Sequence, residues 1–441
     1  MNFRIKNIVK IIDEHTFEVL KKSLISLIIK LCGIIVFFLC SMYMGRTIGA
    51  KGVGIFNLSY KIVVVLIILC TLGFPQFLIK EGAKATINSI DKSFISSLKY
   101  TSYRLVAITC CFVFLFIILF LKPISFNIFQ EPELKWPLAV MLIGMIPQLF
   151  TRLLSSLIFS FRKVWQGNLF NEKALNIYIV GLLFFVSYVL DIKLEVLDVA
   201  IIFALSYTLV YIVAEIYWRN IFGGGVKKII AIGGTLKKTL PFYSFYLINI
   251  VISNLDILIL GMLVGTESLG IYSIAVQLAF LTSFVLQVTN SAISPKLAIL
   301  YADGKLVEME TMVRRVTSLL IIIGGLFSLY FVFFGRFTLS LWGEDFTEGY
   351  VALLILCVGQ FISIITGCTG QILAMCGYEK VLVKISSTSL ILSIMLYVVL
   401  ISSYGFLGAA IVNALRLIYE NGLKLYFVNR KIKINTLPRV I

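Results

Sequence analysis

We single out eleven ionisable side chains inside the long apolar segments of this sequence. Burying a charge in lipid costs a few kcal/mol, so such a group usually faces a cavity or a partner. Five of them lie near the predicted inner interface, which the side-chain stems can reach: Arg104, Glu172, Lys173, Glu215 and Lys424. Two acids, Asp256 and Glu420, lie deeper. The remaining bases are Lys30, Lys61, Arg152 and Arg416, and we interpret them as a cationic patch for phosphate groups, which accept charge-assisted hydrogen bonds.

Arg416 lies near the bilayer midplane in this interpretation. It is about ten residues into the last apolar segment, or roughly 15 Å at 1.5 Å per residue. Glu420 follows one helical turn later and Lys424 one turn after that, so a structural ion pair and a ligand contact are both open. Arg152 has no acid one turn away, which favours a position facing a cavity.

Polar side chains recur at helical spacing on the first two apolar segments of each half of the chain. Asn249, Ser253 and Asp256 share one helix face, and Gln287 belongs to a similar stripe on the next segment. We predict that these four residues line a cavity, and that Asp256 either pairs with a base there or couples the protein's action to an ion. The alternative is that such stripes only hydrogen-bond one helix to another.

The sequence offers few residues suited to catalysis or metal binding. The only histidine is His15, and the eight cysteines have neither metal-ligand nor paired spacing. The glycines at 223–225 lack the Gly-Lys-Ser/Thr sequence of a phosphate loop. We therefore predict no catalytic residues, no metal and no cofactor, and leave coupling to an ion gradient or the membrane potential open.

Composition predicts an integral membrane protein. Hydrophobic residues make up 60% of the chain, charged residues 14%, and the mean hydropathy is +1.01, so its apolar surface must face lipid. The net charge of +17 is explained by basic residues in short connectors rather than by a nucleic-acid partner. Twelve apolar segments are predicted, near 23–45, 54–79, 100–121, 137–160, 170–190, 198–218, 239–262, 270–294, 314–334, 350–375, 381–402 and 406–428.

Basic residues alternate between connectors in a way that sets the topology. If the N-terminus is cytoplasmic, the inner connectors hold 26 of the 39 Lys and Arg, the outer ones 6, and the spans 7. Both termini are then cytoplasmic by the positive-inside rule. The predicted order is a cytoplasmic amphipathic arm (1–22, or merely a solvated tail), an N-terminal lobe (23–218), a cytoplasmic linker (219–238), a C-terminal lobe (239–428) and a cytoplasmic tail (429–441).

A glycine pattern repeats at one fixed offset. Gly45, Gly49 and Gly54 return as glycines at 261, 265 and 270, each 216 positions on (261 − 45 = 216). In both copies an apolar run ends, a short turn follows and another apolar run begins. The pattern predicts a duplication, with two six-helix lobes related by a pseudo-two-fold axis and Gly49 and Gly265 at equivalent turns.

Residues 45–56 (GRTIGAKGVGIF) and 72–81, together with 254–261, 269–273 and 294–297, resemble the Wzx-type polysaccharide and O-antigen flippases of the MOP superfamily. The resemblance implies a transporter, not an enzyme, that moves an undecaprenyl-diphosphate-linked oligosaccharide to the outer leaflet of the bacterial cytoplasmic membrane. It implies alternating access between the lobes. Its expected partners are the lipid-linked substrate, membrane lipid and the polysaccharide polymerase machinery.

Other functions are weighed against this one. A MATE-like cation-coupled drug antiporter needs a buried exchanging carboxylate, for which Asp256 is the one deep, unpaired candidate in the sequence. A lipid II-type flippase shares the motifs in weaker form. A membrane glycosyltransferase would need a larger outer loop with catalytic acids, and a scaffold that transports nothing is the last alternative.

Overall fold

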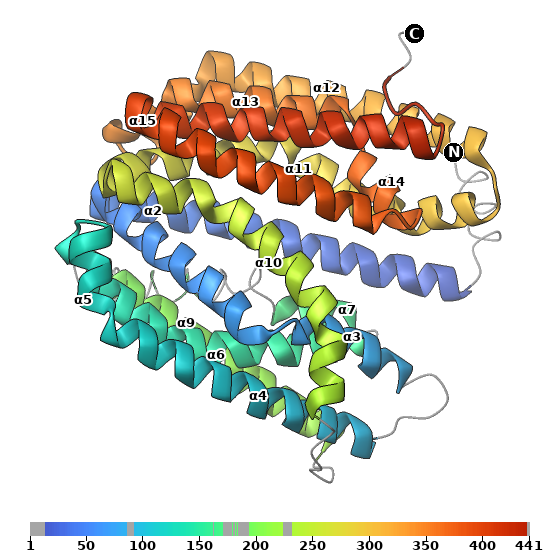
Figure 1. Cartoon of the computed structure of the whole chain (residues 1–441), viewed down its shortest axis with the longest axis horizontal. Coiled ribbons are helices and arrows are strands. Elements are labelled where there is room, and N and C mark those ends of the chain that lie inside the picture. The colour runs from blue at the N-terminus through green and yellow to red at the C-terminus, as the bar shows by residue number, and fades with distance from the viewer. Residues whose placement is uncertain are drawn as a thin grey trace. The chain divides into compact units, whose positions relative to one another are not determined.

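The computed structural model describes residues 14–85, 92–161, 163–170, 179, 181, 183, 194–223 and 232–438, and every regular element in these ranges is a helix (Figure 1). The helices before residue 224 are α2 (Glu14–Thr71), α3 (Phe74–Lys84), α4 (Lys92–Leu119), α5 (Leu121–Pro123), η1 (Ile124–Ile128), η2 (Pro132–Leu134), α6 (Lys135–Ser160), α7 (Val164–Leu169) and α9 (Val196–Phe222). Those after it are α10 (Ile232–Leu263), α11 (Thr266–Ala302), α12 (Leu306–Ser340), η4 (Glu344–Gly349), α13 (Tyr350–Ile365), α14 (Thr369–Met375) and α15 (Glu379–Lys431).

Nine helices of the described residues are long and apolar enough to cross a membrane. Helix α15 contains two predicted segments, joined at Gly405, and α2 contains one predicted segment and most of a second, joined at Gly49, so the nine account for eleven segments (9 + 2 = 11). The second of these, 54–79, is broken at Leu72 and Gly73, and its last residues lie in α3. The remaining predicted segment, 170–190, falls almost entirely outside the described residues. The prediction of an all-helical membrane protein is confirmed, and the full count of twelve stays a prediction.

The repeated glycines adopt matching backbone conformations. Gly49 has φ 67° and ψ −177°, and Gly265 has φ 107° and ψ 175°. Residues with a Cβ rarely adopt positive φ, so both turns depend on glycine. Both angles are of the kind that equivalent turns would share, and the equivalence of the two lobes stays a prediction.

The chain forms two compact units. The first comprises 1–43, 66–121 and 136–246, and the second comprises 44–65, 122–135 and 247–441. The second unit therefore takes in the first glycine turn and the connector after α4, in addition to the C-terminal helices. The predicted lobe boundaries, 23–218 and 239–428, stay a prediction.

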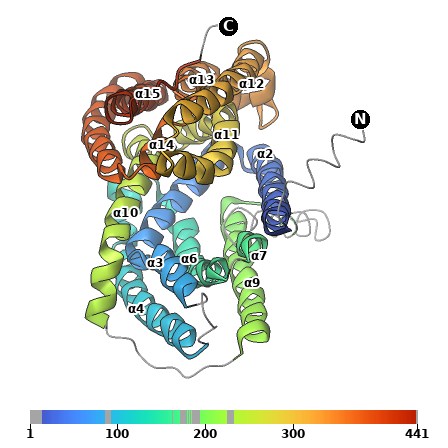
Figure 2. The ribbon, with the colours of Figure 1, turned by 90° about the vertical axis from the view of Figure 1, so that its right-hand side faces the viewer.

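Helices α11, α12, α13 and α15 pack together in the second unit (Figure 2). Small residues allow close approach: a Cβ on Gly359 of α13 would lie 2.8 Å from Cα of Ala414 on α15. The predicted segment 350–375 is broken in the structure, because Gly367, with φ 70°, separates α13 from α14.

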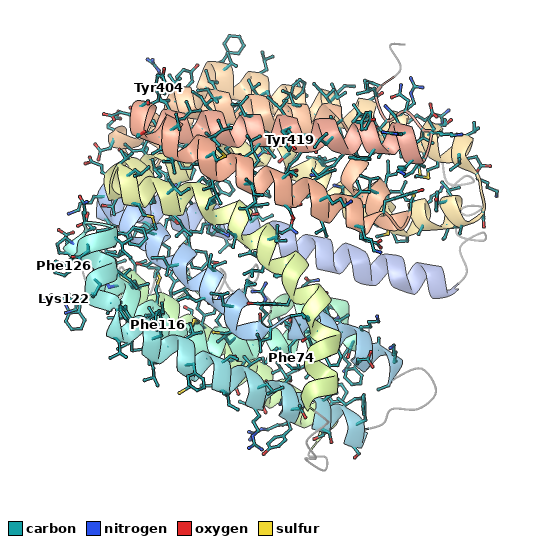
Figure 3. The ribbon with its side chains drawn as sticks, in the orientation of Figure 1. Phe74, Phe116, Lys122, Phe126, Tyr404 and Tyr419 are labelled. Atoms are coloured by element: carbon teal, nitrogen blue, oxygen red, sulfur yellow. The ribbon has the colours of Figure 1, made fainter. Side chains whose placement is uncertain are left out.

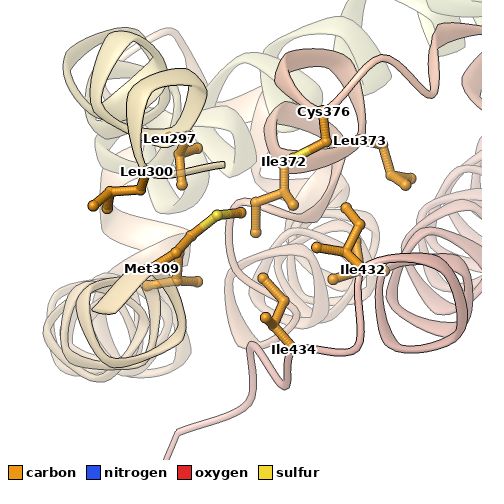
Figure 4. Close-up of a cluster of buried hydrophobic side chains, with 10 residues drawn as sticks. Leu297, Leu300, Met309, Ile372, Leu373, Cys376, Ile432 and Ile434 are labelled. Carbon is orange, nitrogen blue, oxygen red and sulfur yellow. The ribbon is translucent and has the colours of Figure 1, made fainter. Parts of the chain in front are cut away.

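The end of the chain folds back onto this bundle. Ile432 and Ile434 join a buried apolar cluster with side chains from α11, α12, α14 and α15, which include Leu297, Met309 and Ile372 (Figure 4). Thr436 is fully buried and its hydroxyl donates to the carbonyl oxygen of Thr366 (2.9 Å), beside the break between α13 and α14. Residues 432–436 are therefore packed structure rather than a solvated tail, and the predicted cytoplasmic side stays a prediction.

Long apolar side chains cover the outside of several helices. Phe112, Phe116 and Leu119 of α4 are exposed by 72%, 58% and 76%, and Figure 3 shows Phe116 and Phe126 pointing away from the ribbon. Water would penalise such a surface, whereas a lipid environment does not. The exposed surface of α4 is thus that of a membrane-spanning helix.

Candidate functional site

Glu420 lies at the centre of a buried ionic network in the second unit. Its carboxylate accepts hydrogen bonds from Arg416 (3.2 Å), Lys424 (3.0 Å) and the hydroxyl of Ser389 (2.8 Å). The two bases and Glu420 all come from α15, one helical turn apart, and Ser389 lies in the preceding half of that helix. The side chains of Arg416 and Glu420 are 14% and 10% exposed, so solvent screens this pair little.

Asp256 of α10 lies 4% exposed and accepts three hydrogen bonds. The donors are the hydroxyl of Tyr272 (2.9 Å), the side-chain amide of Asn413 (3.0 Å) and the backbone N–H of Ile257 (2.9 Å). Asn413 also accepts a long hydrogen bond from Arg416 (3.5 Å), which joins Asp256 to the network around Glu420. Three helices, α10, α11 and α15, thus meet at one polar centre.

The charges in this centre cancel. Asp256 and Glu420 supply two negative charges, and Arg416 and Lys424 supply two positive ones (−2 + 2 = 0). A buried hydrogen-bonded network of this kind rigidifies the packing of the helices that contribute to it. For Arg416 the structure therefore contains the structural ion pair that the sequence left open.

Tyr272 and Asn413 were not singled out from the sequence. Asn413 precedes Arg416 by three residues and Glu420 by seven, so the helical spacing places all three on one face of α15. That signal was available. Tyr272 carried no comparable signal, because its contact with Asp256 joins two different helices.

Arg152 of α6 has an aromatic neighbour in the first unit. Its guanidinium donates to the hydroxyl of Tyr246 (2.8 Å) and lies 5.5 Å from the centre of that ring. One turn earlier, Gln148 donates to the hydroxyl of Tyr207 (3.0 Å). Cation–π contact and hydrogen bond together hold the guanidinium in a defined place.

A small hollow lies beside Tyr246, where α2 ends and α3 begins. Leu72 and Gly73 both have positive φ there, and a Cβ on Gly73 would lie 2.7 Å from the carbonyl oxygen of Thr239 on α10. The hollow is lined by Ile68, Thr71, Gly73, Pro75, Gln76, Tyr243 and Tyr246. A broken helix next to an arginine gives polar backbone and positive charge in one place, as membrane transporters use at substrate sites.

The other predicted site residues are placed only in part. Lys61 and Asn249 are half-buried, Ser253 and Gln287 are exposed, and Ser253 donates to the backbone carbonyl of Asn249 (2.8 Å). The side chain of Lys30 lies outside the described residues. Convergence of the four cations on one space therefore stays a prediction.

The two glycine turns, residues 45–54 (the first turn) and 261–270 (the second turn), cross each other within the second unit. A Cβ on Gly54 would lie 1.7 Å from the carbonyl oxygen of Thr266, and a Cβ on Gly270 would lie 2.0 Å from that of Ala50. Position 266 is the counterpart of 50, and 270 the counterpart of 54, so the contact is reciprocal, as at a two-fold axis. A third matched pair, Asn57 and Ser273, hydrogen-bonds across the same crossing (2.8 Å).

The fold is that of the membrane transporters of the MOP type. An inward-facing multidrug resistance MATE family transporter of the MOP superfamily superposes with a TM-score of 0.77 at 13% identity, over 93% of this chain and 98% of that one. The lipid II flippase MurJ in an inward closed conformation gives 0.75 at 12% identity, over 93% and 87%. The predicted fold class is confirmed.

The chain belongs to the polysaccharide biosynthesis protein family, which it matches over residues 19–300; residues 241–399 also match the MatE family. It is 29% identical to the capsular polysaccharide biosynthesis protein CapF of Staphylococcus aureus over 35% of this chain and 39% of that one. It is 22% identical to the probable low-salt glycan biosynthesis flippase Agl15 of Haloferax volcanii, over 41% and 38%. The matches therefore cover less than half of these two relatives. The predicted family is confirmed.

Proposed function

We propose that this protein flips an undecaprenyl-diphosphate-linked oligosaccharide from the inner to the outer leaflet of a bacterial cytoplasmic membrane by alternating access. The observation that carries the proposal is the match to the polysaccharide biosynthesis family over residues 19–300. The similarity to a glycan biosynthesis flippase and the fold of a lipid II flippase support it.

Arg152 is our candidate for a phosphate contact. A diphosphate headgroup needs positive charge and hydrogen-bond donors inside the membrane, and a guanidinium supplies both in a planar array. Arg152 lies beside the hollow at the α2–α3 break, where Tyr243 and Tyr246 offer flat faces to a sugar ring. Lys30 and Lys61 stay in the proposed cationic patch, whereas Arg416 is placed in the neutral network and joins the patch only if its ion pair with Glu420 opens.

A cation-coupled drug antiporter is the second candidate, because residues 241–399 match the MatE family. Such an exchanger requires a carboxylate that releases and rebinds a cation. Of the two deep carboxylates in the described residues, Glu420 is already paired with Arg416 and Lys424. Tyr272, Asn413 and Ile257 already donate to the other, Asp256. The fixed donors favour a structural role for Asp256 and so favour the flippase.

Deletion followed by lipid analysis separates the two functions. Loss of a flippase is expected to leave lipid-linked repeat units on the inner leaflet and to reduce the surface polymer. Cells that changed only in drug susceptibility, with normal lipid-linked intermediates, would count against the flippase and for the antiporter.

Tyr246→Phe is expected to lower flipping several-fold without reducing the amount of folded protein. The change keeps the ring under the guanidinium but removes the hydroxyl that accepts from Arg152 (2.8 Å). Surface polymer in a complemented deletion strain gives the transport readout, and size-exclusion of detergent-extracted protein gives the folded amount. Tyr207→Phe is the matched control, because it removes the hydrogen bond to Gln148 one turn away without touching Arg152. Equal loss in both variants would show that Tyr246 only packs.

A further inference from the structure

The connectors between helices make further hydrogen bonds to the two glycine turns near the point where these turns cross. The connector of residues 122–135 belongs to the first repeat, yet Glu131 in it accepts a hydrogen bond from the hydroxyl of Thr266 in the second turn (2.7 Å). In the opposite sense, Arg46 of the first turn donates to the carbonyl oxygen of Leu341 in the second repeat (2.8 Å). Each repeat thus reaches across to the turn of the other.

Glu131 is the carboxylate that contacts both turns. One oxygen lies 3.4 Å from the ammonium of Lys51, in the first turn, and the other accepts from Thr266, in the second. Thr266 is the first residue of α11, so the carboxylate also lies at the N-terminal end of a 37-residue helix, where the helix dipole favours a negative charge.

The backbone around Glu131 is built to present this side chain. Gln130 has φ 50°, which is unfavourable for a residue with a Cβ, and the N–H of Glu131 donates to the carbonyl of Ser125 (2.8 Å). The Glu131 side chain is 14% exposed, whereas that of Glu133 is 64% exposed and pairs with Lys51 (2.8 Å). An exposed ion pair contributes little to stability, so Glu133 is expected to stabilise the contact between the turns less than Glu131 does.

We propose that Glu131 is a latch that joins the two glycine turns, and that it must release Lys51 and Thr266 before the membrane face carrying these turns can open. That face is the outer one in the predicted topology. The latch deepens the proposed flippase function and rests on it, since alternating access requires the outer side to close and open. Glu131 touches no substrate and acts as a positioning residue.

The latch can be tested by the accessibility of the crossing. Ser273→Cys places a thiol at a buried position of the crossing, in a protein whose exposed Cys32 and Cys111 are changed to serine. A membrane-impermeant maleimide added to intact cells is expected to label it several-fold faster when Glu131→Gln is also present. Glu133→Gln is the matched control and should leave the rate unchanged.

A second variant distinguishes loss of the latch from misfolding. Thr266→Val removes the hydroxyl that Glu131 accepts from but keeps both charges and the shape, and it should also speed labelling. Equal rates for Glu131→Gln and Glu133→Gln in folded protein, or faster labelling only from the cytoplasmic side, would overturn the latch. Labelling does not depend on the cargo, so a failed flippase assay with a positive labelling result rejects only the proposed function.

Discussion

Gly270→Ala is expected to nearly abolish transport. The added methyl group would lie 2.0 Å from the carbonyl oxygen of Ala50, and because that atom is backbone, no rotamer change can relieve the overlap. The two turns must separate, which breaks the hydrogen bond between Asn57 and Ser273. Gly54→Ala should act alike, since its methyl group would lie 1.7 Å from the carbonyl oxygen of Thr266.

Surface polymer in a complemented deletion strain measures the loss, and the thermal stability of the purified protein shows whether the fold persists. Gly422→Ala is the control: this glycine lies in α15 with no atom within 4 Å of the added Cβ. Alanine is the better helix former, so this change should be neutral or slightly stabilising, by about 0.5–1 kcal/mol. Normal transport by Gly270→Ala would mean that the close crossing is not part of the working cycle.

The crossing shows what a repeated pattern can predict and where it stops. The offset of 216 identified Gly49 and Gly265 as equivalent, and both have positive φ as a shared turn requires. The sequence did not predict that the turns touch. The periodicity of a sequence indicates which face of a helix is polar or apolar, but not which helix packs against that face. The connector that carries Glu131 has neither an apolar run nor a periodic pattern from which its contacts could be predicted.

In the polar centre, too, partners could be predicted only where both residues lie on one helix. The ion pair of Arg416 with Glu420 could be predicted from the sequence, because both residues lie on one helix at a spacing of four. The partners of Asp256 were not, because Tyr272 lies 16 residues away and Asn413 lies 157 residues away, on other helices. A buried acid signals that a partner exists, and only the packing of α10, α11 and α15 decides which one it is.

Helix ends were also only partly predictable. The apolar run at 350–375 is long enough to span a membrane, so hydropathy alone gives one segment where the structure has α13 and α14. Gly367 permits the break, and the Thr436 hydroxyl hydrogen-bonds the carbonyl oxygen of Thr366 beside it. That donor comes from 70 residues further along the chain, which no local pattern reveals.

Glu420→Gln is expected to destabilise the protein more than loss of either base. Glu420 accepts from Arg416, Lys424 and Ser389, so its neutralisation leaves two positive charges one turn to either side without their shared counter-charge. Breaking a buried ion pair by removing one partner typically costs about 3–5 kcal/mol. We expect a lower midpoint of thermal unfolding in detergent and less folded protein in the membrane.

The matched comparison is with Lys424→Met, whose side chain is the more exposed member of the network (19%) and whose loss leaves Arg416 still paired with Glu420. That variant should unfold closer to the wild-type temperature than Glu420→Gln does, because it leaves no buried charge without a partner. Arg416→Gln decides between the two roles of the arginine. Suppose that Arg416→Gln abolished transport at unchanged stability, while Glu420→Gln changed neither transport nor stability. Arg416 would then have to contact the substrate, and its ion pair with Glu420 would be a resting state that the diphosphate replaces.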